Sequence, residues 1–204
     1  MLTVEGTAGG TPVTDGSEIY YLGCSNGAIQ GTGFMALSPD IERGVLDVGG
    51  GPWSLMMQRS GDFSVLSGAF VIKYPDSADQ QLLFAVWQSY FDFIDPTTYA
   101  AHLFRDPLQP IGTKRVIVHE SYGDVQVPNL ATRYLARTAG LQGLSPLLFP
   151  TFGISEQVGP LDSAYTQWNV HPSPMPPEVN ITPDEENGAH DAVRRRPEEG
   201  GGRE

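Results

Sequence analysis

The chain contains the stretch YYLGCSNGAIQG at residues 20–31, where strand-forming residues give way to small residues around one serine. Upstream, residues 19–22 carry β-branched, aromatic and aliphatic side chains, a run that predicts a buried strand. After the serine, apolar and small residues recur at helical spacing until Ser38 and Pro39 end the run. Ser25 therefore lies where a strand is expected to turn directly into a helix.

The turn has the pattern Gly23-x-Ser25-x-Gly27. So tight a turn brings backbone against backbone, and we expect that only residues without a large side chain fit at positions 23 and 27. Ser25 is then held in a strained conformation with its hydroxyl above the sheet and the helix N-terminus beneath a developing oxyanion. A serine that merely caps the helix is the alternative. The strand before it and the helix after it favour a nucleophile.

The remaining sequence predicts an α/β fold with a mostly parallel sheet. Strands are predicted at residues 18–23, 44–48, 114–119 and 165–170, and helices at 27–37 and 129–138. Residues 50–110 are rich in Met and aromatic residues without strand alternation, which predicts helices inserted between two sheet strands. This insertion is either an ordinary packing layer or a cap over an apolar substrate. We expect a loop at 1–17, a core at 18–49 and 111–195, the insertion at 50–110 and a disordered tail at 196–204.

Composition excludes several classes of partner. The chain has 204 residues and a formal net charge of −12, which argues against nucleic acid and against anionic membranes. No apolar stretch is long enough to span a bilayer. Residues 1–17 lack the basic and apolar regions of a signal peptide, and localisation stays open.

The sequence predicts no cofactor and no metal. Cys24 is the one cysteine, so it cannot form an internal disulfide or bind zinc alone. The four histidines lack metal-ligand spacing. The run Gly49-Gly50-Gly51 is followed by Pro and Trp, without the Lys or Ser/Thr that a phosphate-binding loop requires.

A nucleophilic serine needs a base, and the base needs a carboxylate to orient it. In an α/β sheet these groups are expected after later strands, the acid before the histidine. Asp124 follows the predicted strand 114–119 by a short loop and is the candidate acid. Asp47, at the end of the preceding strand, is the alternative.

His190 is the candidate base, because it lies in a Gly-bearing loop after the last predicted strand. His171, among prolines, is its main competitor. His119 lies inside a predicted strand, where a core or supporting role is expected, and His102 belongs to the insertion.

Three segments together resemble the α/β-hydrolase superfamily, especially its bacterial esterase and lipase-like members. They are the Gly-Cys-Ser-Asn-Gly elbow, Gly-Asp-Val-Gln-Val-Pro-Asn at 123–129 and Ala-His-Asp-Ala-Val at 189–193. The resemblance runs from about residue 15 to residue 195. It implies Ser25 as nucleophile, Asp124 as orienting acid, His190 as general base and the Asn26 N–H as one oxyanion donor. It also implies a small ester or acyl substrate, for which the insertion suggests apolar character.

The chain departs from that family at both ends. After His190, the helix expected to continue meets Pro197 and three glycines at 200–202. Members have further strands and an oxyanion loop before the nucleophile strand, and residues 1–17 show neither. We therefore expect a C-terminal portion of a hydrolase, with an open, apolar edge beside residues 19–22 that favours oligomers or poor solubility. A catalytically incompetent fragment acting as a binding module is the alternative function. Cys24 as a thiol nucleophile is a further alternative.

Overall fold

The computed structural model describes residues 7–8, 11–12 and 18–194 of the chain, and the predicted tail at 196–204 lies outside them. The elements follow the chain in this order: β1 (Thr7–Ala8), β2 (Thr11–Pro12), β3 (Tyr20–Cys24), α1 (Asn26–Leu37), β4 (Arg43–Asp47), α2 (Trp53–Arg59), η1 (Gly61–Phe63), α3 (Ser64–Lys73), α4 (Ser77–Phe91), α5 (Pro96–Ala100), η2 (Ala101–Leu103), β5 (Arg115–Ser121), α6 (Asn129–Ala139), β6 (Gly143–Leu144), β7 (Glu156–Gln157), β8 (Ala164–Trp168) and α7 (Ala189–Ala192). This succession confirms the predicted α/β fold with a helical insertion between β4 and β5.

Within the described residues the larger sheet has six strands in the order β3-β4-β5-β8-β6-β7. Every pairing in it is parallel. Parallel strands end at one edge, so the segments that follow β3, β5 and β8 all begin at the carboxyl edge of the sheet. That edge is where the predicted site residues were expected.

The four predicted strands are present with ends shifted by a residue or two. The prediction missed β6 and β7, which have two residues each and are too short to show a period-two pattern. The expectation that residues 1–17 form only a loop is wrong, because β1 and β2 pair antiparallel there. Strands of two residues also carry too little pattern to be recognised.

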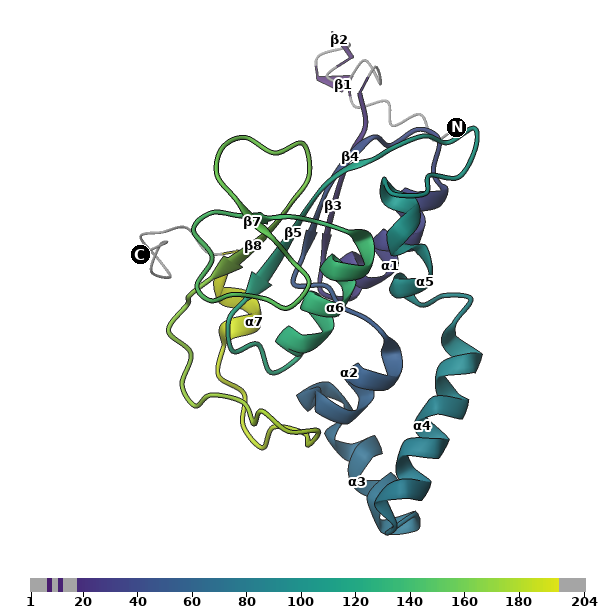
Figure 1. The fold of residues 1–204 in the computed structure, drawn as a ribbon, viewed down its shortest axis with the longest axis vertical. Helices are drawn as coiled ribbons and strands as arrows, with labels where there is room; N and C mark the ends of the chain where they lie inside the picture. Colours follow the sequence, from purple (N-terminus) through teal and green to yellow (C-terminus); the bar gives the residue numbers. More distant parts are fainter. Residues whose placement is uncertain (1–6, 9–10, 13–17, 195–204) are drawn as a thin grey trace.

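The main core lies between one face of the sheet and helices α1, α5 and α6. Successive strand residues point to opposite faces, so Leu46 and Val118 enter this core while Ile117, one residue earlier, faces the other side and is 40 % exposed. Tyr165 of β8 is fully buried in the same core. The helices thus cover one face of the sheet, and α7 lies beside the end of the neighbouring β5 strand (Figure 1).

The insertion divides into two parts. Helices α2, α3 and α4 extend beyond the carboxyl edge of the sheet (Figure 1) and enclose an aromatic cluster of their own around Phe70 and Phe84. Ala100 of α5 and Leu103 of η2 instead belong to the main core. The helical layer that projects from the sheet is therefore shorter than the predicted range of 50–110.

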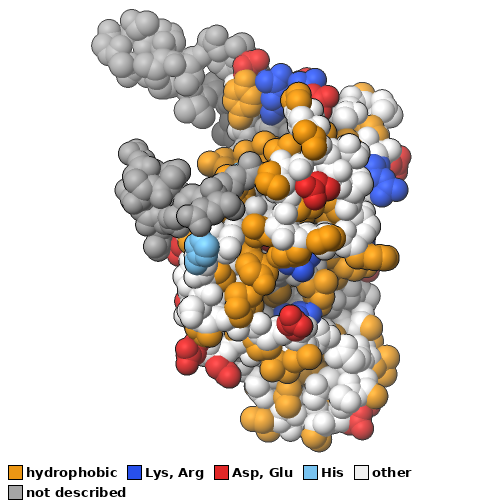
Figure 2. All heavy atoms as spheres, turned by 60° about the vertical axis from the view of Figure 1, so that its left-hand side comes forward, with side chains coloured by type: hydrophobic (Ala, Val, Ile, Leu, Met, Phe, Trp, Pro, Cys, Tyr) orange, Lys and Arg blue, Asp and Glu red, His pale blue; other side chains and the backbone are white. Residues whose placement is uncertain are grey.

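Hydrophobic side chains run along the whole length of the face in Figure 2, down to the lower end formed by α3 and α4. On those helices Val65 and Ile72 are more than four-fifths exposed, and Leu82 and Tyr90 about two-thirds or more. No helix among the described residues combines the length and apolar character needed to cross a membrane.

Candidate functional site

Ser25 occupies the turn between β3 and α1 with a strained backbone. Its φ of 55° and ψ of −124° lie in a region that residues other than glycine rarely adopt, and such strain gathers at functional sites. The Ser25 N–H donates to the Asp47 carbonyl oxygen at 2.9 Å, which fixes the turn to β4. The side chain of Ser25 makes no capping hydrogen bond to α1. The reading of Ser25 as a helix-capping serine is therefore wrong.

The two elbow glycines differ in the space around them. A Cβ on Gly23 would stand 2.4 Å from the carbonyl oxygen of Gly27, too close for any side chain. A Cβ on Gly27 would meet no atom within 4 Å. The prediction that position 27 also needs glycine is wrong, because the crowding at the turn comes from the Gly27 carbonyl and not from its Cα.

The N-terminus of α1 offers backbone donors beside Ser25. The amides of Ala28 and Ile29 donate to the Ser25 carbonyl oxygen. In the described part of the chain the amides of Asn26 and Gly27 have no hydrogen-bond acceptor. Unpaired N–H groups at the start of a 12-residue helix suit a negatively charged oxygen, so the Asn26 N–H has the chemistry expected of an oxyanion donor.

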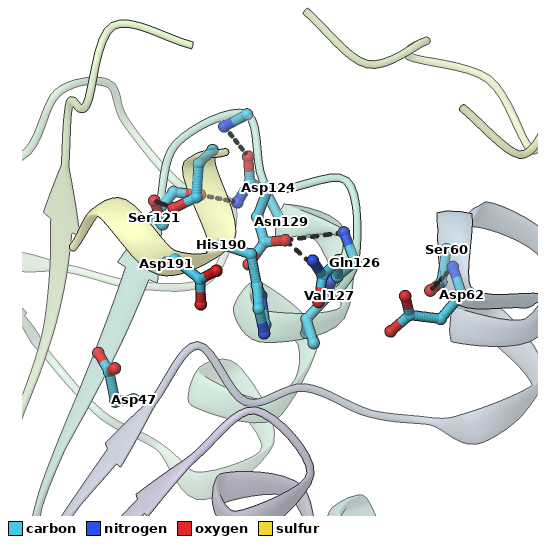
Figure 3. A network of polar contacts seen from close by, with 12 residues as sticks. Asp47, Ser60, Asp62, Ser121, Asp124, Gln126, Val127, Asn129, His190 and Asp191 are labelled. Atoms are coloured by element: carbon cyan, nitrogen blue, oxygen red, sulfur yellow. Dashed lines mark hydrogen bonds and ion pairs between the residues drawn. The ribbon is translucent and has the colours of Figure 1, made fainter. Parts of the chain in front are cut away.

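Asp124 and His190 meet as the sequence predicted for an acid and a base. His190 Nδ1 lies 2.7 Å from Asp124 Oδ2, and the two residues are 3 % and 2 % exposed. The other oxygen, Oδ1, accepts the backbone N–H groups of Gln126 at 2.8 Å and Val127 at 2.9 Å (Figure 3). Every oxygen of this buried carboxylate is therefore hydrogen-bonded, as its burial requires.

Burial and pairing act in opposite directions on His190. Burial lowers the pKa of His190, but the hydrogen bond and negative charge of Asp124 outweigh it and raise that pKa above its ordinary value. Burial also raises the pKa of Asp124, and its hydrogen bonds with His190 and two backbone amides counter part of the rise. Because Nδ1 faces Asp124, Nε2 is the ring nitrogen left for proton transfer.

Asp47, the alternative acid, pairs with a different histidine, His119. Asp47 Oδ1 lies 3.2 Å from His119 Nδ1, and Asp47 Oδ2 lies 3.8 Å from Nε of Arg194. Oδ2 makes no hydrogen bond although it is buried. Asp47 therefore pairs with His119, and Asp124 pairs with His190.

The other two histidines lie in other surroundings. His102 contacts Asp106, four residues later in the chain. His171 is exposed, with a φ of 53°. In the part of the chain that the structure describes, His119 and His190 thus each have a buried carboxylate partner, and the His190 side chain is 4 % exposed against 24 % for His119.

The structure does not join Ser25 to His190. Ser25 follows β3, Asp124 follows β5, and β4 lies between these strands. Among the described residues the Ser25 hydroxyl makes no hydrogen bond. The three side chains share the carboxyl edge, and hydrogen bonds of unliganded catalytic groups are often long or unformed.

Sequence reasoning missed the polar residues around the acid loop, which is the segment 122–128 that carries Asp124 between β5 and α6. Ser121, Asn129 and Asn187 hydrogen-bond to the backbone of this loop or of α7. Behind it, the fully buried Glu120 accepts hydrogen bonds from Arg133 and Tyr165. Their pattern in sequence carries no signal, since each contact depends on segments brought together by the fold.

Two clefts border the acid loop. One of about 280 Å³ includes Asp124, Arg59 and Arg133 in its lining. A larger one of about 870 Å³ lies between α3, α4 and residues 180–186, and Val125 forms part of its wall. Its lining combines apolar side chains such as Phe84 with acidic ones such as Asp62, so it is less apolar than the sequence suggested. The described residues contain no group of three or more His, Cys, Asp or Glu side chains that could hold a metal ion.

No protein-family model matches the chain, and a search of curated proteins finds no match either.

The elbow gives a prediction with a matched control. We expect Gly23→Ala to lower the free energy of unfolding by about 1–3 kcal/mol, because its methyl group meets a backbone oxygen that cannot move away. Gly27→Ala should leave stability unchanged or raise it by up to about 1 kcal/mol, since the added methyl has space and alanine favours helix. Urea denaturation of both variants measures the difference. Equal losses at the two positions would contradict the assigned crowding.

The buried pair gives a prediction about titration. We expect NMR titration to place the pKa of His190 above about 6.5, the ordinary value, and Asp124→Asn to lower it because the carboxylate is what raises it. With its pKa raised in the folded state, His190 contributes stability fully present below the unfolded-state pKa and lost as pH rises through the folded-state pKa. Asp47→Asn is the control and should move the pKa of His190 much less. An unchanged pKa in Asp124→Asn would contradict the pairing.

Proposed function

We propose that the protein is a serine hydrolase that cleaves carboxylic esters through an acyl-enzyme intermediate. The observation that carries the proposal is the strained Ser25 at the start of α1, together with a buried Asp124–His190 pair at the same edge of the sheet. A strand-turn-helix serine, a later acid and a last histidine are the parts that such chemistry needs, in the expected order. This arrangement also supports the resemblance to esterase and lipase-like α/β-hydrolases.

The proposed reaction begins with neutral His190, which takes the proton of the Ser25 hydroxyl at Nε2 as the oxygen attacks the ester carbonyl. Negative charge then develops on the carbonyl oxygen, and the Asn26 N–H stabilises it. His190 returns the proton to the leaving alcohol, and the acyl group remains on Ser25. Water, activated by His190, releases the acid. Asp124 holds the ring with Nε2 free and stabilises the charged imidazole.

The proposed substrate is a small ester with an apolar acyl group. Support comes from Val71, Ile72 and Phe84, the apolar part of the cleft beside the acid loop, whose lining also includes the acidic residues Asp62, Asp184, Glu185 and Glu186. Cys24 is the last residue of β3, and Ser25 occupies the strained position beyond it, so we assign the nucleophile to Ser25 and not to the thiol.

The role of Ser25 can be tested by activity. We expect Ser25→Ala to abolish both hydrolysis of a short p-nitrophenyl ester and labelling by a fluorophosphonate, because the variant lacks the hydroxyl on which the proposed acyl-enzyme forms. Asp124→Asn should lower kcat by several orders of magnitude while the protein stays folded, since the neutral side chain no longer holds the neutral ring in its required tautomer or stabilises the charged ring.

Asp47→Asn is the matched control and should retain most of the activity, because Asp47 pairs with His119. Unchanged turnover in Ser25→Ala would remove this residue from the mechanism. An inactive, unlabelled wild-type chain would instead favour the binding-module alternative.

We also propose that the chain associates through the free edge of β3. Among the described residues β3 pairs with β4 alone, and on it Tyr20 is 57 % and Leu22 70 % exposed. An apolar strand edge with unpaired backbone groups tends to pair with another chain. Support comes from these two exposed side chains, which the helices of the main core do not cover.

Sedimentation velocity tests the association. We expect the wild-type chain to sediment as an oligomer and Leu22→Lys to shift it to the monomer, because a charge on an edge strand opposes pairing. Leu130→Lys, which changes a leucine 42 % exposed on α6, is the control and should not alter the distribution. A monomeric wild-type chain would exclude the association.

A further inference from the structure

The position of His190 is not explained by its own helix. α7 has only four residues, and residues 169–188 before it contain no helix or strand. A helix that short has almost no stability of its own, because nucleation costs more than one turn of hydrogen bonds returns. Contacts with the rest of the fold must therefore hold His190 against Asp124.

The residue before His190 is held at both of its backbone groups. The Ala189 N–H donates to Asn187 Oδ1 at 3.1 Å, and the Ala189 carbonyl accepts the Ser121 hydroxyl at 2.6 Å. Ala189 and Ser121 are each 1 % exposed, so water cannot replace the hydrogen bond between them. The peptide that carries His190 is thus fixed in orientation.

The residue before Asp124 is held in the same way. The Gly123 N–H donates to Asn129 Oδ1 at 2.7 Å, and the Gly123 carbonyl accepts Asn187 Nδ2 at 2.9 Å. Asn129 also donates to the carbonyl of Ser121 at 2.6 Å (Figure 3). Gly123 has a φ of 79°, so the acid loop turns sharply at this point.

Asn187 is the side chain common to both sets of bonds. Its Nδ2 donates to the carbonyls of Gly123 and Pro174, and its Oδ1 accepts the Ala189 N–H. Reversing the amide would set its NH₂ against an N–H and its oxygen against two carbonyls, so the pattern admits one orientation. One side chain therefore joins the acid loop to the histidine helix independently of the Asp124–His190 bond.

We propose that Asn187 and Ser121 are positioning residues that hold the His190 helix on the Asp124 loop, so that His190 keeps one geometry relative to Asp124 and to Ser25. The catalytic meaning of this proposal rests on the proposed hydrolase function. The positioning itself does not, because it concerns the His190 side chain and is measurable without turnover.

The experiment compares Asn187→Ala and Ser121→Ala in the full chain with Asn169→Ala and Ser163→Ala. The Asn169 side chain accepts the nearby His171 N–H, and that of Ser163 accepts the Val116 N–H at the other end of the sheet. NMR titration measures the pKa of His190, whose signal is assigned as the one that is absent from the spectrum of His190→Gln. Fluorophosphonate labelling of Ser25 and the steady-state kinetics of ester hydrolysis follow the site.

We expect both test variants to lower the pKa of His190 toward its ordinary value, since a loosened contact with Asp124 weakens the effect that raises it. Labelling and kcat should fall by up to about 100-fold with KM little changed, as for a misplaced catalytic group. Both control variants should match the wild type. If Asn187→Ala fails to fold, Ser121→Ala, which removes a single hydrogen bond, decides the outcome.

A pKa of His190 that stays at the wild-type value in both test variants, or moves equally in the controls, overturns the proposal. If the pKa falls as expected while the wild-type chain is neither labelled nor active, the positioning stands and the hydrolase function fails. If the wild type is active and both test variants keep its kcat and its His190 titration, the hydrolase function stands and the positioning fails.

Discussion

The hydrogen bond between Asp124 and His190 joins residues 66 positions apart whose side chains are almost wholly buried. Removing a carboxylate and an imidazole from water costs free energy unless each finds partners. The fold provides these partners. Two backbone amides donate to the second carboxylate oxygen, and β5 and β8, which are parallel, end at the same edge of the sheet, so that the segments carrying Asp124 and His190 begin there. The pair thus depends on the sheet topology. The irregular segment after β8 is held by Asn187 beside the pair and by hydrogen bonds to Arg59 and Ser67 of the insertion.

The sequence predicts those parts of the fold whose determining residues are neighbours in the chain. Strand formers, glycine, serine and a helical pattern follow one another around Ser25, and each step can be inferred from its neighbours. The limit of the insertion could not be inferred, because α5 resembles the preceding helices and is distinguished only by burial against α1 and α6. The need for glycine at 23 and not at 27 likewise depends on which backbone atom faces which, and spacing does not contain that information.

The site was predictable to the extent that it follows strand ends. Asp124 and His190 come after strands that the sequence shows, and those positions favoured them over Asp47 and His171. Ser121 and Asn187 could not be selected in that way. Asn187 lies in a turn-rich segment where such residues are common, and its bond to the Gly123 carbonyl spans 64 positions. Supporting residues of this kind become visible only when the chain is folded.

Two carboxylate–histidine pairs stand at the same edge of the sheet, and their surroundings differ. The His190 side chain is 4 % exposed, whereas that of His119 is 24 % exposed and packs edge-on against Trp168. Asp47 also supports the Ser25 turn through its backbone, because the Asp47 carbonyl accepts the Ser25 N–H. Its side chain lies 3.8 Å from Arg194 Nε, and Arg194 donates to the His190 carbonyl at 3.4 Å. Asp47 therefore connects the elbow with the histidine helix without contacting the imidazole of His190. The buried Asp47 carboxylate beside the Ser25 turn thus has a structural explanation. The proposed acid–base chemistry is assigned to the other pair, whose histidine is the more deeply buried.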